Sequence, residues 1–251
     1  MNTKQLRILT YNTHKGFSAN NRHFILHRLR DALRDTDADV LFLQEMQGEH
    51  SKHQQTQLDW PNCPHAEFIA QDSWPYHTYG QNAVYSKGHH GNAILSKFPL
   101  TQCENINVSP VSWASRSLLH AVVTLPNTDQ DIHIICIHFG LIGFERRRQF
   151  ELLSKRVNEH VPSDSALIVA GDFNDWTEQS EKRFAQYFEL KEAYQTIHNR
   201  YARTWPAWLP MLKMDRIFYR GLTVSSCERP RHGLWHQLSD HAPLLATFEL
   251  D

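Results

Sequence analysis

The chain has 251 residues, of which 41% are hydrophobic and 21% charged, an ordinary mixture for a globular protein of one large or two small domains. With 26 Lys and Arg against 27 Asp and Glu, the net charge is -1, so composition gives no overall attraction to nucleic acid or to an anionic membrane. The four cysteines share no metal-binding spacing, and the chain has neither an HExxH motif nor a run of about 18 apolar residues, which argues against a zinc protease and a transmembrane segment. We expect a cytoplasmic protein with reduced thiols and no signal peptide.

The N-terminal part of the chain predicts a strand, a helix and a second strand. Apolar residues alternate with polar ones over residues 6–11, and a polar turn with a glycine follows. Apolar side chains then recur at helical spacing between positions 25 and 33, with Asn20 or Asn21 expected as the N-cap of that helix. The apolar run 40–43 predicts a buried strand that ends in Gln44 and Glu45.

The middle of the chain gives a less regular pattern. Residues 46–88 are rich in Gln, His, Pro and aromatic side chains, and they predict long loops with short strands. Residues 92–96 indicate a strand closed by a proline turn. Residues 118–125 and 132–138 predict two strands of a hairpin, joined by the polar turn 126–131.

The C-terminal part alternates between helices and strands. An apolar stripe predicts a helix over 144–161, in which the arginines 146–148 should cover a surface face, with one of them buried against an acidic partner. The apolar run 167–170 predicts a short buried strand that stops at Gly171. The remaining elements are a helix and two strands, over 178–190, 215–219 and 242–248. No repeat or linker divides the chain, which favours a single α/β domain.

Polar side chains stand directly after, or at the start of, these apolar runs. A single Asp beside a strand is usually a cap or a turn, and a single His is usually a core residue with its hydrogen bonds satisfied. If the strand ends converge, however, the set supplies carboxylates and amides for a Mg²⁺-type cation and two imidazoles for proton transfer. The set comprises Asn12, Glu45, His138, Asp172, Asn174, Asp215, Asp240 and His241.

Short motifs around these residues carry a family resemblance. They are, in chain order, Thr10–Tyr–Asn12, Leu43–Gln–Glu45, Ile137–His138, Gly171–Asp–Phe–Asn174, Met214–Asp–Arg216 and Ser239–Asp–His241. With the motifs in this order, the chain resembles the endonuclease/exonuclease/phosphatase superfamily from near residue 6 to residue 248. The resemblance implies one catalytic domain over 1–251 with an α/β fold, a four-layer sandwich of two mixed β-sheets flanked by helices (DNase I-like). It also implies hydrolysis of a phosphodiester bond by in-line attack of water, with Mg²⁺ or Mn²⁺ as cofactor.

The same resemblance implies ligands for the metal. Glu45 corresponds to the principal ligand, and Asn12 and Asp240 help to hold the ion or the phosphate. Two cations are candidates for the substrate phosphate on their positions alone. Lys15 follows the first strand and could reach a phosphate or simply face solvent, and Arg116 precedes a strand where it could bind a phosphate bidentately.

Roles in the chemistry follow from the resemblance as well. Asp172 would position or deprotonate the attacking water, and Asn174 would orient that water or a phosphate oxygen. His241, held by Asp215, would stabilise charge on the phosphorane or act as a base, and His138 is a candidate acid. Fixed donors and a cation are what a phosphorane requires, because negative charge accumulates on its oxygens.

Three functions remain open from the sequence. The first is a nuclease-type phosphodiesterase acting on nucleic acid, favoured by the makeup of the superfamily. The second is a phospholipid or headgroup phosphodiesterase or phosphatase, suggested by the apolar, proline-punctuated stretch 205–212 and by tryptophans near the motifs, Trp113, Trp176 and Trp235. The third is a catalytically inactive binding module on the same fold, against which the complete set of acidic and histidine residues argues.

Overall fold

The computed structural model describes residues 5–109, 115–126, 131–177, 179–230 and 234–250. The strands form two six-stranded sheets. The first sheet has the order β11-β12-β1-β2-β4-β3, and only β1 and β2 are parallel. Its strands are β1 (Gln5–Asn12), β2 (Val40–His50), β3 (Tyr76–Tyr85), β4 (Gly88–Ser96), β11 (Thr223–Glu228) and β12 (Leu244–Glu249).

The second sheet has the order β5-β6-β7-β8-β10-β9, with β7 and β8 as its parallel pair. Its strands are β5 (Leu100–Asn107), β6 (Ser117–Thr124), β7 (Asp131–His138), β8 (Ala166–Asp172), β9 (Lys191–Glu192) and β10 (Asp215–Arg220). Both sheets are therefore mixed, as the family resemblance implies.

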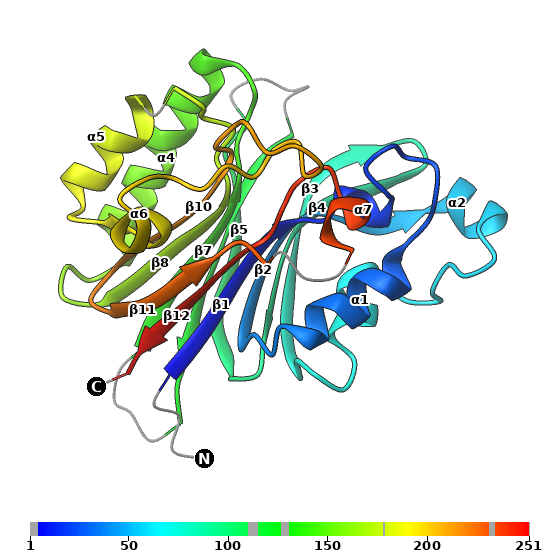
Figure 1. Ribbon diagram of the computed structural model, residues 1–251, viewed down its shortest axis with the longest axis horizontal. Coiled ribbons are helices and arrows are strands. Elements are labelled where there is room, and N and C mark those ends of the chain that lie inside the picture. The colour runs from blue at the N-terminus through cyan, green and yellow to red at the C-terminus, as the bar shows by residue number, and fades with distance from the viewer. Residues whose placement is uncertain (1–4, 110–114, 127–130, 178, 231–233, 251) are drawn as a thin grey trace.

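Helices cover the outer faces of the two sheets (Figure 1). Those packed on the first sheet are α1 (Leu26–Asp35), α3 (His65–Ala70) and α7 (Trp235–Leu238). Helix α2 (Ser51–Thr56) directly follows β2 and lies at the right of the view in Figure 1. Those on the second sheet are α4 (Gly143–His160) and α5 (Gln179–Tyr187), while α6 (Ala193–His198) packs against β10 and β11. No helix of the described ranges is long and apolar enough to cross a bilayer.

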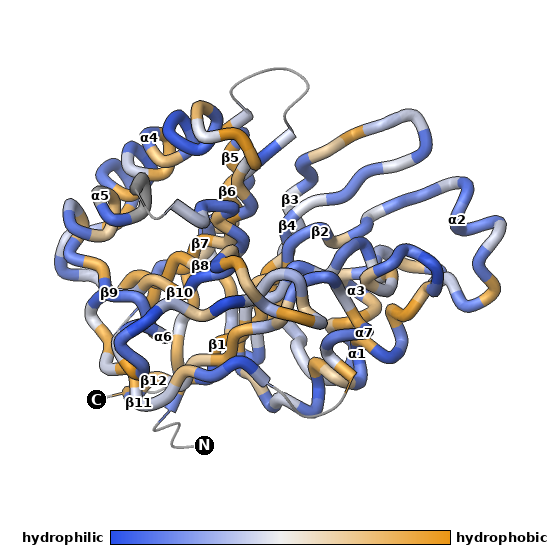
Figure 2. The backbone as a smooth tube through the Cα atoms, turned by 45° about the horizontal axis from the view of Figure 1, so that its top comes forward, coloured by the Kyte–Doolittle hydropathy of each residue, from blue (hydrophilic) through white to orange (hydrophobic). Residues whose placement is uncertain are grey.

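Alternate side chains of each central strand face opposite sides of its sheet, which separates the core between the sheets from the layers under the helices. In β1, Leu6 and Ile8 point into the core between the sheets, whereas Leu9 and Tyr11 point toward the helices. In the second sheet, Ile134 faces the inter-sheet core and Ile135 packs under α4. Figure 2 shows the consequence, with largely hydrophobic central strands and with helices α4 and α5 that alternate between hydrophilic and hydrophobic residues. The result is the predicted four-layer sandwich.

The structure also corrects details of the expected elements. Residues 46–88 contain the end of β2, two helices and the long strand β3 rather than long loops with short strands. Helix α1 begins at Leu26 after Ile25, so neither Asn20 nor Asn21 is its N-cap. The Asn20 side chain instead accepts hydrogen bonds from Ser18 Oγ and Arg22 N, which closes a local turn. The predicted hairpin of β6 and β7 is confirmed, although residues 127–130 of its turn and Trp113 lie outside the described residues.

Candidate active site

A row of three polar residues crosses one end of the second sheet. His138 at the end of β7 is the register partner of Asp172 at the end of β8, and Asp172 is in turn the partner of Asp215 at the start of β10. Gly171 makes this register possible, because its φ is +148° and a Cβ at its position would lie 2.0 Å from the carbonyl oxygen of Ile137. Backbone pairing therefore places the three side chains side by side.

His241 adds an imidazole from the other sheet. It directly precedes the segment that leads into β12, and its Nδ1 lies 2.9 Å from Asp215 Oδ2. Its Nε2 lies 3.7 Å from Asp172 Oδ2, and Nε2 of His138 lies 3.6 Å from the same oxygen. The ligand atoms of Asp172, Asp215 and His241 all lie within 4.8 Å of one another. Residues from both sheets thus surround the Asp172 carboxylate.

Asn12 at the end of β1 completes this contact between the sheets. Its Nδ2 donates a 3.2 Å hydrogen bond to Asp172 Oδ2, and its backbone carbonyl accepts a 2.7 Å bond from Ser239 Oγ. Ser239 Oγ also accepts from the backbone N–H of His241 at 3.1 Å. The Ser239 hydroxyl therefore ties β1 to the turn that carries His241, a role that the sequence gave no reason to assign.

Glu45 is placed differently from the sequence expectation. The expected strand ended at this residue, but β2 continues to His50, and Glu45 lies inside it at a bulge between Leu43 and Met46. The φ of Glu45 is +55°, a sparsely populated conformation for a residue with a Cβ. A bulge changes the direction in which its side chains point, and Gln44, the residue before Glu45, is the register partner of Asn12. Lys15 Nζ lies 3.7 Å from Glu45 Oε2.

Asp240 is anchored from two directions. The indole N–H of Trp205 donates a 3.2 Å hydrogen bond to Asp240 Oδ2, and His14 Nδ1 lies 3.9 Å from Oδ1. His14 follows Asn12 and belongs to the short 3₁₀ helix η1 (His14–Gly16). Asp240 therefore lies beside the end of β1, and sequence periodicity gave no signal for the contributions of Trp205 and His14.

Asn174 and Arg116 meet at one backbone carbonyl. Asn174 Nδ2 and Arg116 Nε donate to the carbonyl oxygen of Phe139 at 2.9 Å and 3.2 Å. The backbone N–H of Asn174 donates to Asp172 Oδ1 at 3.0 Å. Asn174 has a positive φ of 50°, and Arg116 is half-buried, so both side chains are held next to the His138 strand end.

The neighbouring Asp175 contacts Arg146 and Thr177 instead of the cluster around Asp172. Its Oδ1 lies 3.7 Å from Arg146 Nη2 and accepts hydrogen bonds from the backbone N–H and hydroxyl of Thr177. Arg146 is 5% exposed, which confirms that one arginine of the 146–148 run is buried against an acidic partner. This pair supports the loop after β8 and takes no part in the cluster around Asp172.

Burial and neighbouring charges set the protonation of the central groups. Burial raises the pKa of Asp172 to about 7, although the nearby His241 opposes that shift. Burial alone would lower the pKa of His241, but the carboxylates of Asp215 and Asp172 outweigh it and raise the pKa to about 10. Burial, followed by the charge of Arg116, lowers the pKa of His138 well below its usual range. His241 is therefore a cation at neutral pH, and His138 is a neutral imidazole.

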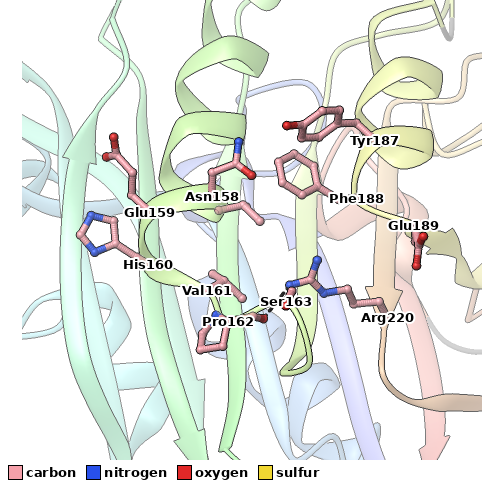
Figure 3. A pocket seen from close by; sticks show the side chains of 11 residues that line it. Asn158, Glu159, His160, Val161, Pro162, Ser163, Tyr187, Phe188, Glu189 and Arg220 are labelled. Atoms are coloured by element: carbon pink, nitrogen blue, oxygen red, sulfur yellow. Dashed lines mark hydrogen bonds between the residues drawn. The ribbon is translucent and has the colours of Figure 1, made fainter.

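Two cavities bear on where a substrate could bind. One cavity has a volume of about 500 Å³ and is lined by Lys15, Phe17, Asn21, Gln47, His50, His53, Tyr85 and His90. A larger one of about 750 Å³ lies between the ends of α4 and α5 and contains Arg220 and Tyr187 (Figure 3). The larger cavity shares no residue with the cluster around Asp172. The smaller one includes Lys15, whose ammonium lies 3.7 Å from Glu45.

The donor set fits a hard divalent cation. Glu45 Oε2 and Asp215 Oδ1 are buried oxygens that accept no hydrogen bond from any residue in the described part of the chain. Lys15 and His241 lie near these two carboxylates, but a buried carboxylate oxygen that accepts no hydrogen bond is still costly, and a bound cation would offset that cost. Carboxylate and amide oxygens are also the ligands that Mg²⁺ and Mn²⁺ prefer.

This fold and this clustering of carboxylates and histidines at one end of two mixed sheets define a class of protein. The chain belongs to the Endonuclease/Exonuclease/phosphatase family, whose model matches residues 9–241. Members of this family generally hydrolyse phosphate esters. The family predicted from the motifs is therefore confirmed.

Individual relatives place the chain within that family. It is 41% identical over 244 residues to the uncharacterized protein YbhP of Escherichia coli (strain K12), covering 97% of this chain and 96% of the relative. Among solved structures, an endonuclease/exonuclease/phosphatase from Beutenbergia cavernae has a TM-score of 0.80 at 18% identity, covering 98% of this chain and 72% of that one. TDP2 of D. rerio, complexed with a single-strand DNA product, has a TM-score of 0.71 at 18% identity, covering 98% and 99%. These structures show that the fold is shared.

Proposed function

We propose that the protein is a Mg²⁺- or Mn²⁺-dependent phosphodiesterase that cleaves its substrate by in-line attack of water. The observation that carries this proposal is the environment of Asp172. Its buried carboxylate contacts Asn12 and His241 from the first sheet's side and His138 from its own sheet. A single oxygen surrounded in this way is suited to hold or deprotonate a nucleophilic water.

Glu45, Asn12 and Asp240 are the residues that would hold the metal. Asn12 ends β1 opposite Gln44, the residue before Glu45, and Asp240 lies beside that strand end, where His14 is 3.9 Å away. When bound, the ion would polarise the phosphate ester and neutralise charge on its oxygens. The buried oxygen of Glu45 that lacks a hydrogen bond supports this assignment.

The two imidazoles take different roles. His241 is held by Asp215, and a positively charged imidazole at this point stabilises negative charge that develops on phosphorus-bound oxygens. His138 is buried and neutral, so it is suited to donate a hydrogen bond and poorly suited to act as a general acid. Asn174 would orient the water that Asp172 deprotonates, because its backbone N–H is bound to that carboxylate.

Lys15 and Arg116 are proposed to bind the substrate phosphate. Lys15 pairs with Glu45, and the charges of both Lys15 and Arg116 act on His138, so both cations stand near the row of polar residues. The Arg116 guanidinium is fixed through Nε to the carbonyl oxygen of Phe139. An arginine fixed in this way binds phosphate with little loss of side-chain entropy.

A substrate panel tests the proposed reaction. Purified protein with Mg²⁺ or Mn²⁺ is expected to hydrolyse bis(p-nitrophenyl) phosphate and one of single-stranded DNA, duplex DNA, RNA or phospholipid vesicles, and to lose that activity in EDTA. The nuclease-type substrate draws support from the fold shared with TDP2, which holds a DNA product in its own structure. If no phosphate ester is turned over with either metal, the proposal is wrong and an inactive binding module is the better description.

A further inference from the structure

Exposed apolar side chains gather on the 141–144 segment, which runs from the connection after β7 into the first turn of α4. They are 59%, 54% and 60% exposed at Leu141, Ile142 and Phe144. The acid of this stretch, Glu145, is buried. The exposed side chains between 141 and 148 are Leu141, Ile142, Phe144, Arg147 and Arg148. Every exposed side chain between 141 and 148 is therefore apolar or cationic, and the next exposed acid, Glu151, pairs with Arg148 at 2.7 Å.

A second segment, the 205–212 loop, has the same character. The Trp205 indole and the backbone N–H of Ala207 both donate to Asp240, at 3.2 Å and 2.7 Å, so the loop is anchored at a site residue. Its exposed side chains are Trp208, Leu209 and Met211, at 69%, 51% and 56%. Arg203 and Lys213 flank it, and residues 203–213 contain no Asp or Glu. The loop thus presents an apolar tip between two cations.

The two segments stand at the same end of the second sheet. The first follows the carboxyl end of β7 and the second precedes the amino end of β10, and these two ends are linked through Asp172 in one row of register partners. Trp176, 45% exposed, follows β8 between them, with the Arg146 guanidinium 5.1 Å from its ring centroid. In Figure 1 this end of the sheets lies opposite the two chain termini. We call the two segments together with Trp176 the apolar rim.

We infer that the apolar rim docks the protein on a lipid bilayer that contains anionic phospholipids, with the site facing the headgroups. Trp, Phe, Leu and Met side chains enter the boundary between headgroups and acyl chains, and flanking arginines and lysines bind lipid phosphates. If the site hydrolyses phosphodiesters, as proposed above, docking would present to it the phosphodiester of a phospholipid headgroup; this consequence rests on the proposed function. The net charge of -1 does not oppose this docking, because Arg147, Arg203 and Lys213 flank the rim and neither rim segment contains an acid.

The composition of the rim favours a bilayer over other partners. Single-stranded nucleic acid binds by stacking bases on aromatic rings, and Leu141, Ile142 and Met211 offer no such ring. A protein partner usually covers one contiguous apolar patch, whereas these tips stand on separate loops around a site for phosphate chemistry. Separate apolar tips with flanking cations match the layered chemistry of a membrane surface.

Vesicle sedimentation tests this inference without relying on turnover. In EDTA, the wild-type chain should sediment with phosphatidylcholine vesicles containing phosphatidylglycerol, and less with phosphatidylcholine alone or at high salt. Trp208→Asp and Phe144→Asp should each weaken the partition about tenfold or more. Asp near the start of α4 is favourable to that helix, so Phe144→Asp should fold. The matched controls are Leu58→Asp and Tyr187→Asp, at positions 103% and 70% exposed but away from the rim, and they should bind like wild type.

The outcomes separate this inference from the proposed function. Vesicle binding that fails for the wild type, or that all four variants retain or lose alike, overturns the docking surface. So does loss of oligonucleotide binding in the rim variants with unchanged vesicle binding, which would assign the rim to nucleic acid. Hydrolysis of bis(p-nitrophenyl) phosphate is measured in parallel. Its absence with intact vesicle binding would count against the phosphodiesterase alone.

Discussion

The hydrogen bond between His241 Nδ1 and Asp215 Oδ2, 2.9 Å long, joins the two sheets at the site. Asp215 begins β10 of the second sheet, and His241 leads into β12 of the first. An ionised carboxylate can only accept a hydrogen bond, so Nδ1 carries the proton and the ring orientation is fixed. Nε2 is thereby held 3.7 Å from Asp172.

Replacing Asp215 by Asn tests this relationship. Asp215→Asn keeps the shape of the side chain but removes the charge that stabilises the His241 cation, so kcat should fall about 10²-fold or more with little change in KM. The downfield proton resonance of His241 Nδ1–H should also be lost or shifted in the NMR spectrum. A variant with wild-type kcat and an unchanged resonance would show that Asp215 does not orient His241.

Asp172 and Asp175 make a matched pair, because both are buried carboxylates and they lie three positions apart at the end of β8. Asp172→Asn should reduce kcat at least about 10³-fold and leave the melting temperature near wild type, since Asp172 faces the site. Asp175→Asn should lower stability by about 1–3 kcal/mol with little effect on kcat, because it removes the carboxylate beside the buried Arg146 guanidinium. Steady-state kinetics and thermal unfolding measure both. Equal effects of the two variants on kcat would contradict the assignment of Asp172.

Divalent cations should stabilise the fold in the absence of substrate. Binding at 100 times the dissociation constant adds about 2.7 kcal/mol, enough to raise the melting temperature of a chain of this size by several degrees. Calorimetry in Mg²⁺, Mn²⁺ and EDTA measures this shift. Glu45→Gln should remove most of it, whereas Glu49→Gln, an exposed residue later in the same strand, should not. A shift that survives in Glu45→Gln would place the metal elsewhere.

Lys15 should act on the substrate and not on the metal. Lys15→Gln removes a cation 3.7 Å from Glu45, so it should raise KM about tenfold while the Mg²⁺ concentration for half-maximal activity stays equal or falls. Titrations of substrate at saturating Mg²⁺, and of Mg²⁺ at saturating substrate, separate the two effects. If the Mg²⁺ requirement rises and KM does not, Lys15 supports the metal site instead.

The buried His65 should make the free energy of unfolding depend on pH. It is buried among aromatic rings that include Trp60 and Phe24, and burial lowers its pKa to about 3 from an unfolded value near 6.5. As the pH falls, His65 is protonated in the unfolded chain before it is protonated in the folded one. The free energy of unfolding is therefore highest above pH 6.5 and decreases toward pH 3, by on the order of 2 kcal/mol at pH 4.5.

The variant His65→Phe should flatten this dependence. Denaturant unfolding at pH 7 and pH 4.5 should show a smaller loss of stability than in wild type, without abolishing it, because the pKa of His120 is also lowered to about 3 by burial. At pH 7 the variant should be at least as stable as wild type, since neither ring nitrogen of His65 has a hydrogen-bond partner among the described residues. An unchanged pH dependence would exclude His65 as its source.

Local patterns in the sequence predicted many of the helices and strands. The apolar runs at 6–11, 40–43 and 167–170 became buried strands, and the stripe over 144–161 became α4. Such patterns are reliable because strands and amphipathic helices each repeat one burial period. Strands β3, β5, β9 and β11 were missed, and β3 and β5 show why. Most of their side chains are exposed or half-buried, so they lack a clear apolar alternation.

The sequence by itself determined which residue types stand at the strand ends, and hence the family and the predicted site, because each motif is local and tied to a short strand. Only the tertiary structure decided that Glu45 lies at a bulge inside β2, that Asp175 pairs with Arg146, and that the two distant segments of the apolar rim stand at one end of the second sheet. Those outcomes depend on sheet register and on packing between residues far apart in the chain. Periodicity along one strand or helix contains no information about either.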